Sequence, residues 1–414
     1  MQREIIPAIG CTEPIAVSLC VAKATETLGK KPERIHVFLS PNVLKNAMGV
    51  GIPGTGMIGL PIAVALGALI GKSEYGLEVL RDLQSEDVEQ GKLFISEQRI
   101  KIDVKPDTDE KLYIETRCYS GETSSTAIIR GSHTQFSHIE RNGEILLNKV
   151  VDAAQETEDE MHLTFKKVYE FAIESPIEEL RFILEAAKMN REASKTAQEH
   201  NYGHNVAKSL TGERGKTLFG DNPHSRMISA TAGACDARMD GALIPVMSNS
   251  GSGNQGVAAT LPVLTYAEDA DSDENSLIRA LILSNLSVIY IKQHLGRLSA
   301  LCGCVVAAAG SSCGITYLMG GNYEQVTFAI KNMIANITGM ICDGAKPSCA
   351  LKIASGTSTA MLSALMAMEN RVVSSQEGIV EDDVDKTIRN LALIGSKGMA
   401  ETDKIVLNVM TNKE

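Results

Sequence analysis

The sequence predicts an α+β protein in which an N-terminal mixed α/β domain with a sheet (residues 1–160) precedes a mostly helical C-terminal domain (residues 161–414). Three observations support this prediction. Alternating, β-branched segments bounded by turn residues cluster in the first third of the chain. The composition then changes at "QETEDE" (155–160). Beyond that point, apolar residues recur with helical spacing almost to the end.

The first predicted helix covers residues 12–28. Thr12 can cap it, Glu13 lies in the first turn near the positive end of the helix dipole, and Gly29 follows as a stop signal. Cys11 is then expected just outside the helix N-terminus, where a thiolate is electrostatically favoured.

The next predicted elements are strands of one sheet and a buried helix. The helix covers residues 60–70, after the turn "IPGTG". The strand segments are "RIHVFLS" (34–40), "RIKIDVK" (99–105), "KLYIETRCYS" (111–120) and "STAIIRGSHTQFSHIERNG" (125–143).

The second half is predicted to alternate apolar helices with Gly-rich breaks. Its first helical segment covers residues 175–200, where Ile177, Leu180, Leu184 and Ala187 share one face. The expected breaks are residues 247–256, 307–314 and 342–349. Because the chain has 35 Gly, no Trp and only 4% aromatic residues, we expect Ala-, Ile-, Leu- and Val-rich cores with closely packed helices.

Composition and charge exclude several classes of protein. The net charge is -11 and no dense Lys/Arg run occurs, which argues against nucleic-acid binding. The uncharged stretches 47–71 and 298–321 contain too much Gly, Pro and Ser for membrane spans. Since "MQREIIPAIG" lacks the features of a signal peptide, we expect a cytoplasmic protein. Gly/Ala-rich helix faces favour a homo-oligomer.

Nine cysteines in a chain expected to be cytoplasmic indicate free thiols, a metal site or catalysis rather than disulfides. Cys302, Cys342 and Cys349 form a Cys-x39-Cys-x6-Cys arrangement. Three thiolates can hold an iron–sulfur cluster and leave one iron open to substrate. Two alternatives remain open: these thiols are small buried hydrophobic residues, or they bind a structural zinc, although the spacing is unlike that of zinc knuckles.

Two other segments could bind a small ligand. "NSGSGNQG" (249–256) offers the donors of Asn249, Ser250, Ser252 and Asn254 on a backbone that a carboxylate can approach closely, but a plain Gly-rich turn is the alternative. "DARMDG" (236–241) places charges in an Ala/Gly-rich stretch. A structural ion pair is the first interpretation of these charges, and substrate recognition is the second.

Five segments together resemble the iron–sulfur L-cysteine desulfidase family. They are "PAIGCTEPIAV" (7–17), "IPGTGMIGLPIAVALGALIG" (52–71), "DARMDGALIPVMSNSGSGNQG" (236–256), "AAAG" (307–310) and "ICDGAKPSCALK" (341–352). More distantly, the second half resembles the α part of bacterial iron–sulfur L-serine dehydratases. The resemblance implies a labile [4Fe–4S] cluster, no pyridoxal phosphate, and conversion of L-cysteine to pyruvate, ammonia and sulfide by α,β-elimination.

The resemblance also implies roles for individual residues. Cys302, Cys342 and Cys349 would hold the cluster, with Cys304 as a possible substitute for Cys302. Cys11, in the "GCTEP" motif, and Lys45 are the candidate catalytic residues, Cys11 as the base or as an occasional fourth iron ligand. The candidates for holding the carboxylate and ammonium groups of the small amino-acid substrate are Thr12, Glu13, Asn46, Asn249, Ser250 and Asn254.

Two departures from the related families limit what is carried over. Met57 stands where serine dehydratases have a histidine, so their base does not transfer and an L-serine dehydratase is the second hypothesis. The desulfidase family also has more sequence before the "GCTEP" motif, so a missing helix is expected to leave one face of the first domain exposed. A non-catalytic amino-acid-binding protein, with the cysteines as core residues, is the third hypothesis.

Overall fold

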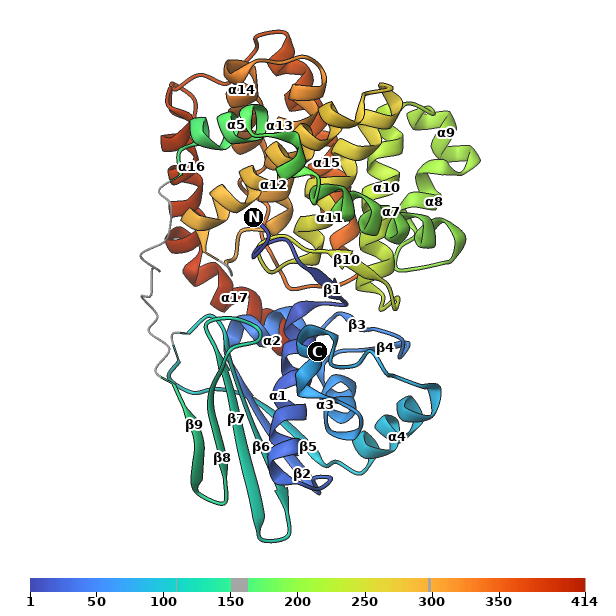
Figure 1. Ribbon diagram of the computed structural model, residues 1–414, viewed down its shortest axis with the longest axis vertical. Helices are drawn as coiled ribbons and strands as arrows, with labels where there is room; N and C mark the ends of the chain where they lie inside the picture. Colours follow the sequence, from blue (N-terminus) through green and yellow to red (C-terminus); the bar gives the residue numbers. More distant parts are fainter. Residues whose placement is uncertain (109, 150–162, 297–298, 414) are drawn as a thin grey trace.

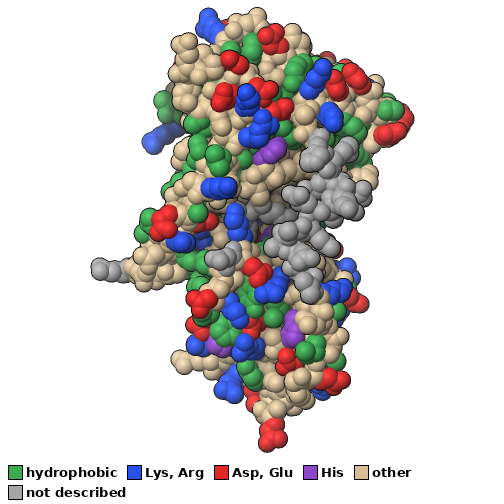
Figure 2. Space-filling model, turned by 90° about the vertical axis from the view of Figure 1, so that its left-hand side faces the viewer, with side chains coloured by type: hydrophobic (Ala, Val, Ile, Leu, Met, Phe, Trp, Pro, Cys, Tyr) green, Lys and Arg blue, Asp and Glu red, His purple; other side chains and the backbone are tan. Residues whose placement is uncertain are grey.

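The chain forms two parts stacked along its long axis, a sheet-containing part and a helical part (Figure 1). This is a computed structural model, and it describes residues 1–108, 110–149, 163–296 and 299–413. The mixed sheet with helices, followed by a mostly helical region, confirms the predicted α+β class. Figure 2 shows acidic and basic side chains interspersed over both parts on the face in view, so the net negative charge forms no single patch there.

A six-stranded sheet forms the base of the N-terminal part, in the order β5-β2-β6-β7-β8-β9. Only β2 and β5 pair in parallel, and the other neighbours are antiparallel. The predicted segment 125–143 supplies two strands, and β9 was not predicted. The strands are β2 (Arg34–Leu39), β5 (Ile100–Val104), β6 (Tyr113–Ser120), β7 (Thr123–Arg130), β8 (Phe136–Arg141) and β9 (Glu144–Asn148).

The helix α1 (Thr12–Leu28) packs against β6 and β7 on one side and against α3 (Leu60–Leu69) on the other. Its bounds are those predicted, and Gly29 ends it with φ 78°. The predicted cap is wrong, because Cys11 and not Thr12 holds the N-cap position. The other elements of this part are α2 (Pro41–Ala47), β3 (Gly51–Ile52), β4 (Met57–Ile58), the 3-10 helix η1 (Ser73–Glu78) and α4 (Ser85–Ser96).

The helical part is built around α13 (Gly303–Leu318), which packs against α11, α12, α14 and α15. The other helices, with the π-helical turn η2, are α5 (Phe165–Glu174), α6 (Ile177–Leu180), α7 (Ile183–Glu199), α8 (Val206–Thr211), α9 (Glu213–Phe219), α10 (Pro223–Met239), α11 (Gly253–Asp269), α12 (Glu274–Leu295), α14 (Tyr323–Ile337), α15 (Cys349–Met368), α16 (Val384–Leu393), η2 (Ile394–Gly398) and α17 (Ala400–Thr411).

The predicted Gly-rich break at 307–314 is wrong, since these residues lie inside α13. Gly310 serves close packing rather than a turn. A Cβ there would lie 2.5 Å from the backbone oxygen of Ser284 in α12, so glycine lets the two helices approach. The predicted breaks at 247–256 and 342–349 fall between helices in part, and α11 and α15 begin within them at Gly253 and Cys349.

Contacts between the two parts involve segments far apart in sequence. Strand β1 (Pro7–Ile9) pairs antiparallel with β10 (Pro245–Met247), and α17 at the end of the chain lies beside α2 (Figure 1). The predicted domain boundary at 155–160 lies outside the described residues and stays a prediction. Among the helices that the structure describes, none is long and apolar enough to cross a membrane.

Candidate active site

A cavity of about 120 Å³ lies between the two parts of the chain. Nine of the candidate site residues line it, whereas Lys45 and Asn249 do not. From the N-terminal part come Cys11, Thr12, Glu13 and Asn46, and from the helical part come Ser250, Asn254, Cys302, Cys342 and Cys349. The structure therefore brings together residues that stand up to 338 positions apart in the chain, from Cys11 to Cys349.

Four helices direct their N-termini at this cavity. Cys11 is the N-cap of α1, Cys302 is the N-cap of α13, and Cys349 is the first residue of α15. Ser252 caps α11 by accepting a hydrogen bond from the backbone of Gln255. Because a helix N-terminus carries partial positive charge and free N–H groups, this arrangement favours anionic ligands and thiolates.

The backbone explains why Cys302 and Cys342 meet although they are distant in sequence. The N–H of Cys302 donates to the carbonyl of Met340 over 2.9 Å, and the N–H of Cys342 donates to the carbonyl of Ala300 over 2.6 Å. An antiparallel bridge between Leu301 and Ile341 lies between these two hydrogen bonds. The two cysteines are thus held on adjacent extended segments.

The thiols of this cluster influence one another. Burial, and then the neighbouring thiols of Cys304 and Cys342, raise the pKa of Cys302 well above its ordinary value. Burial also raises the pKa of Cys349, although neighbouring lysines oppose the shift. Without a cation, Cys302 and Cys349 therefore keep their protons, and a bound cation would reverse that preference.

Cys304 differs from Cys302 in the contact of its thiol. Its Sγ donates to the backbone oxygen of Lys352 over 3.0 Å, so it is engaged in packing α13 against α15. Cys302 makes no such side-chain hydrogen bond among the described residues. The geometry therefore favours Cys302 over Cys304 as the third ligand of a cluster.

The donor set fits an iron–sulfur cluster better than a single ion. Within the described ranges, no three His, Cys, Asp or Glu side chains lie close enough together to hold one metal ion. A [4Fe–4S] cluster spreads its irons over a larger volume, so its cysteine ligands stand further apart. Thiolates are the usual ligands of such clusters.

Cys11 and Glu13 form a hydrogen-bonded pair on the opposite wall. The Sγ of Cys11 donates to Oε2 of Glu13 over 3.1 Å, and the hydroxyl of Thr12 donates to the same oxygen over 2.9 Å. The Asn46 amide donates to Oε1 of Glu13 over 3.2 Å. Burial, and then the Glu13 carboxylate, raise the pKa of Cys11 well above its usual range. The expected thiolate is therefore wrong for this structure, because these effects outweigh the helix dipole.

Arg238 brings a buried cation to the cavity. It is 2% exposed, and its guanidinium donates to the Gly10 carbonyl over 2.7 Å and to Oδ1 of Asn254 over 2.9 Å. Its Nε has no hydrogen-bond partner, and no carboxylate of the described residues lies within ion-pair distance. A Cβ at Gly253 would lie 2.3 Å from this Nε, so glycine makes room for the guanidinium.

The predicted ion pair within "DARMDG" is not formed, which corrects the first interpretation of that segment. The carboxylate of Asp236 accepts hydrogen bonds from the backbone N–H groups of His204 and Val206, over 3.0 and 2.8 Å. That of Asp240 accepts one from Gly203. Both acids therefore hold the loop before α8, and Arg238 remains available to an anion in the cavity.

Gln255 is a cavity residue that sequence reasoning passed over. It is 3% exposed, and its Oε1 has no hydrogen-bond partner. It belongs to the quoted segment "NSGSGNQG", yet its position in the first turn of α11 was not recognised. His133 and Lys292 also line the cavity, and no sequence signal distinguished them from other scattered histidines and lysines.

The structure places Asn249 and Lys45 outside the cavity wall. The Asn249 amide donates to Asn285, and its Oδ1 accepts from the hydroxyl of Ser250, so it supports the loop behind the cavity. Lys45 is 1% exposed and forms an ion pair with Asp403 of α17. It also donates to the Cys342 carbonyl over 3.3 Å. Lys45 thus reaches the site only through the backbone of a cysteine.

Comparisons with known proteins identify the family of this chain. The model of the family "Serine dehydratase alpha chain" matches residues 74–408, and a UPF0597 protein of Bacteroides fragilis is 64% identical over 414 residues, covering 100% of this chain and 97% of the relative. The chain belongs to the UPF0597 family. The UPF0597 proteins of Bacteroides thetaiotaomicron and Shewanella halifaxensis are 64% and 43% identical, each over 100% of this chain and over 96% and 97% of the relative.

The names of these UPF0597 relatives state no activity. The serine dehydratase alpha chain region confirms the more distant of the two resemblances, and it begins well before the helical part. Such a region indicates an enzyme of the amino-acid lyase type. All nine cysteines of the chain are free thiols in this structure, and the four in this wall are consistent with the iron–sulfur domain of that family.

Proposed function

We propose that this UPF0597 protein is an iron–sulfur lyase that converts L-cysteine to pyruvate, ammonia and sulfide. The observation that carries the proposal is a single cavity with Cys302, Cys342 and Cys349 on one wall and Glu13 and Arg238 on the other. Such a cavity combines a thiol set able to hold a cluster with the Glu13 carboxylate and the Arg238 guanidinium. A small zwitterionic amino acid complements that pair of charges.

Cys302, Cys342 and Cys349 would hold a [4Fe–4S] cluster. When bound, the cluster would supply a Lewis acid, the iron without a cysteine ligand, for the substrate carboxylate and the departing sulfur. Four helix N-termini around the cavity stabilise the added negative charge of the thiolates and of the substrate.

The side chains orient the substrate. Arg238 offers its guanidinium, which has no carboxylate partner among the described residues, to the substrate carboxylate as a charge-assisted hydrogen-bond donor. Glu13 and the free Oε1 of Gln255 accept hydrogen bonds from the ammonium group. Because Asn254 and the Gly10 carbonyl fix the guanidinium, its position does not depend on the ligand.

Proton transfer falls to the Cys11–Glu13 pair. In this structure Cys11 keeps its proton and directs it at Glu13. Positive charge brought by a bound cluster and by the substrate ammonium would favour transfer of that proton to Glu13, which leaves a thiolate that can accept the Cα proton. The Cα–H electrons form the Cα–Cβ double bond and the Cβ–S bond breaks, which releases the sulfur as hydrogen sulfide after protonation. Aminoacrylate then tautomerises to an imine, and water converts it to pyruvate and ammonia.

An L-serine dehydratase of the same iron–sulfur type is the second candidate, and the family match favours it. In that reaction, the Cβ–O bond breaks and water leaves. Met57, the residue at the histidine position of serine dehydratases, lies in β4 and does not line the cavity, so the base must differ. A third candidate from another class is a non-catalytic amino-acid-binding protein that uses the same charged groups. Homo-oligomer formation and a cytoplasmic location stay predictions.

The experiment compares wild type, Cys342→Ala and Cys313→Ala after anaerobic iron–sulfur reconstitution. Cys313 is the matched control, because it lies on α13 fully buried and bonded to the Ala309 carbonyl, away from the cavity. We expect wild type and Cys313→Ala to bind iron and release sulfide and pyruvate from L-cysteine. Cys342→Ala should lose both properties.

Two outcomes decide between the candidates. A kcat/KM for L-serine above that for L-cysteine selects the dehydratase. Iron-loaded wild type that turns over neither amino acid contradicts the lyase proposal, and calorimetric binding of either amino acid would then support the binding protein.

A further inference from the structure

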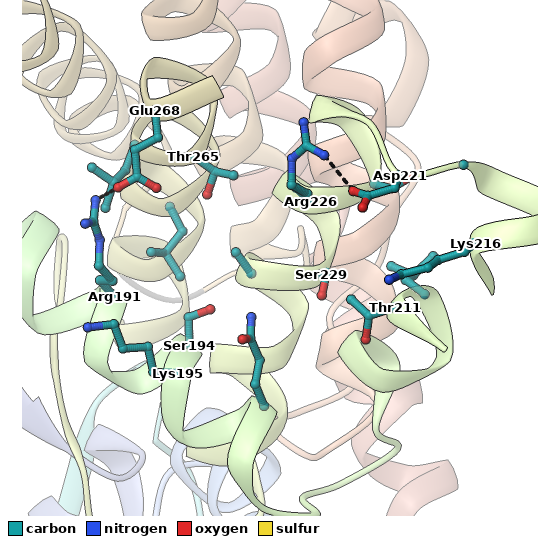
Figure 3. A pocket seen from close by; sticks show the side chains of 17 residues that line it. Arg191, Ser194, Lys195, Thr211, Lys216, Asp221, Arg226, Ser229, Thr265 and Glu268 are labelled. Carbon is teal, nitrogen blue, oxygen red and sulfur yellow. Dashed lines mark hydrogen bonds and ion pairs between the residues drawn. The ribbon is translucent and has the colours of Figure 1, made fainter. Parts of the chain in front are cut away.

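A second pocket, of about 500 Å³, lies within the helical part between α7, α8, α9, α10 and α11. Figure 3 shows its walls, with Arg191 and Glu268 on one side and Asp221 and Arg226 on the other. Pockets of this size commonly hold small organic ligands. Along α11, Asn254 of the catalytic cavity and Leu264 of this pocket are separated by about 15 Å at 1.5 Å per residue, so the two sites are distinct.

The charges of this pocket leave one cation without a counterion. Arg191 pairs with Glu268, Arg226 pairs with Asp221 and Asp269, and Lys195 pairs with Glu192. Lys216 has no carboxylate within ion-pair distance in the part of the chain that the structure describes. In Figure 3 the Lys216 side chain extends from α9 toward the pocket, whereas the Lys195 ammonium turns away from it. The pocket thus has room for one negative charge.

Ser194 is an unpartnered polar group aimed into the same space. It is 5% exposed, lines the pocket, and makes no side-chain hydrogen bond with any described residue. Its hydroxyl oxygen is not among the fully enclosed atoms that lack a partner, so it faces the open space of the pocket. Figure 3 shows Ser194 on the opposite side of the pocket from Lys216.

The surface between these two groups is mixed, because Thr211 and Ser229 line it beside several apolar side chains. Leu261 and Leu264 of α11 are 1% and 2% exposed in the whole molecule, and both line the pocket with Leu210 and Ala230. A ligand that lies across them can therefore bury an aliphatic body. Its two ends would meet a cation on one side and a neutral hydroxyl on the other.

We propose that this pocket binds a small aliphatic monocarboxylate with an uncharged hydrogen-bonding group at its other end. The carboxylate pairs with Lys216, the chain lies on the leucines, and the uncharged group hydrogen-bonds Ser194. Dicarboxylates fit less well, since the remaining cations already have partners. The site does not depend on the reaction proposed above, because its occupancy is measured by binding alone.

The test uses three matched ligands on the full chain by isothermal titration calorimetry: 5-oxohexanoate, its neutral amide 5-oxohexanamide, and hexanoate, which lacks the ketone. Wild type should prefer 5-oxohexanoate over the amide by about fivefold, as an exposed charge pair allows. It should also prefer 5-oxohexanoate over hexanoate by about fivefold, as a neutral hydrogen bond allows.

Two variants test which residue binds each end of the ligand. Lys216→Ala should remove the preference for 5-oxohexanoate over the amide and leave the preference over hexanoate. Ser194→Ala should do the reverse. Lys195→Ala is the matched control and should bind like wild type, because the Lys195 ammonium is paired with Glu192. Lys216 is exposed, so its variant should keep the thermal transition of wild type. The absence of saturable binding by all three ligands overturns the proposal, and so does an unchanged preference in both variants.

Discussion

Arg238→Lys tests the role of the buried cation in the catalytic cavity. The substitution keeps the positive charge but removes the planar group that donates over 2.7 Å to Gly10 and over 2.9 Å to Asn254. A lysine cannot make both of these contacts and still offer a fixed donor to the substrate. Hydrogen bonds to charged groups contribute about 1.5–3 kcal/mol. We therefore expect kcat/KM to fall by about 10- to 150-fold.

Whether KM or kcat changes shows how Arg238→Lys lowers kcat/KM. A carboxylate is bound equally in the ground state and the transition state, so the change should appear mainly as a higher KM, with kcat nearly unchanged. The assay is sulfide release from L-cysteine by iron-loaded protein over a wide range of substrate concentration. Chemical denaturation of the same samples shows whether the fold is affected.

Arg279→Lys is the matched control for Arg238→Lys. Arg279 also donates to two backbone carbonyls, those of Ala172 and Ser175, over 3.0 and 3.2 Å, but it does not line the cavity. The Arg279→Lys variant should be less stable than wild type, and its KM should be unchanged. The reasoning is refuted if Arg238→Lys leaves KM at the wild-type value, or if both variants raise KM alike.

Three further predictions concern residues around the site and in the sheet. Lys45→Met should destabilise the protein by about 3 kcal/mol because it leaves Asp403 without its cation, and the double variant with Asp403→Asn should recover most of the stability and activity; an inactive but stable double variant would instead support a catalytic Lys45. Gly253→Ala should raise KM as Arg238→Lys does, since the added Cβ displaces the guanidinium; normal kinetics in this variant would contradict the packing argument. Burial raises the pKa of Glu115, but three side-chain hydrogen bonds outweigh burial and hold this pKa below its ordinary value, so the contribution of Glu115 to stability is present above the ordinary pKa and is lost as the pH falls. In urea denaturation, the gap between wild type and Glu115→Gln should be about 1–3 kcal/mol at pH 7 and should shrink below about pH 4.5; a gap that is constant with pH would count against this explanation.

Local signals were enough to predict much of the fold. The bounds of α1 follow from a Pro in the first turn and a Gly at the end, both of which act within a few residues. The alternation of β2, β5 and β6 is equally local. The interpretation failed at 307–314, where glycines serve packing between helices. Such a close approach depends on a partner helix that is distant in sequence, so no local pattern reveals it.

The candidate site was predictable in its chemistry and less so in its geometry. Cysteine spacing and the quoted motifs pointed to nine residues that do line one cavity. Lys45 was a candidate catalytic residue, but its side chain turns toward Asp403, which lies 358 positions away. The free Nε of Arg238 and the free Oε1 of Gln255 emerge only when the whole hydrogen-bond network is known. A sequence cannot show which polar group is left without a partner.

Because the cavity takes its groups from both parts of the chain, the contacts between the parts control its geometry. Three of these contacts involve the site directly: β1 pairs with β10 just before the loop of Ser250, Arg238 holds the Gly10 carbonyl next to Cys11, and Lys45 joins α17 to the Cys342 carbonyl. Catalytic groups must be held to a fraction of an ångström, since small misplacements cost large factors in rate. A change at any of these contacts should therefore reduce activity before it unfolds either part, which makes Asp403, remote from the chemistry, as informative a position as the cysteines.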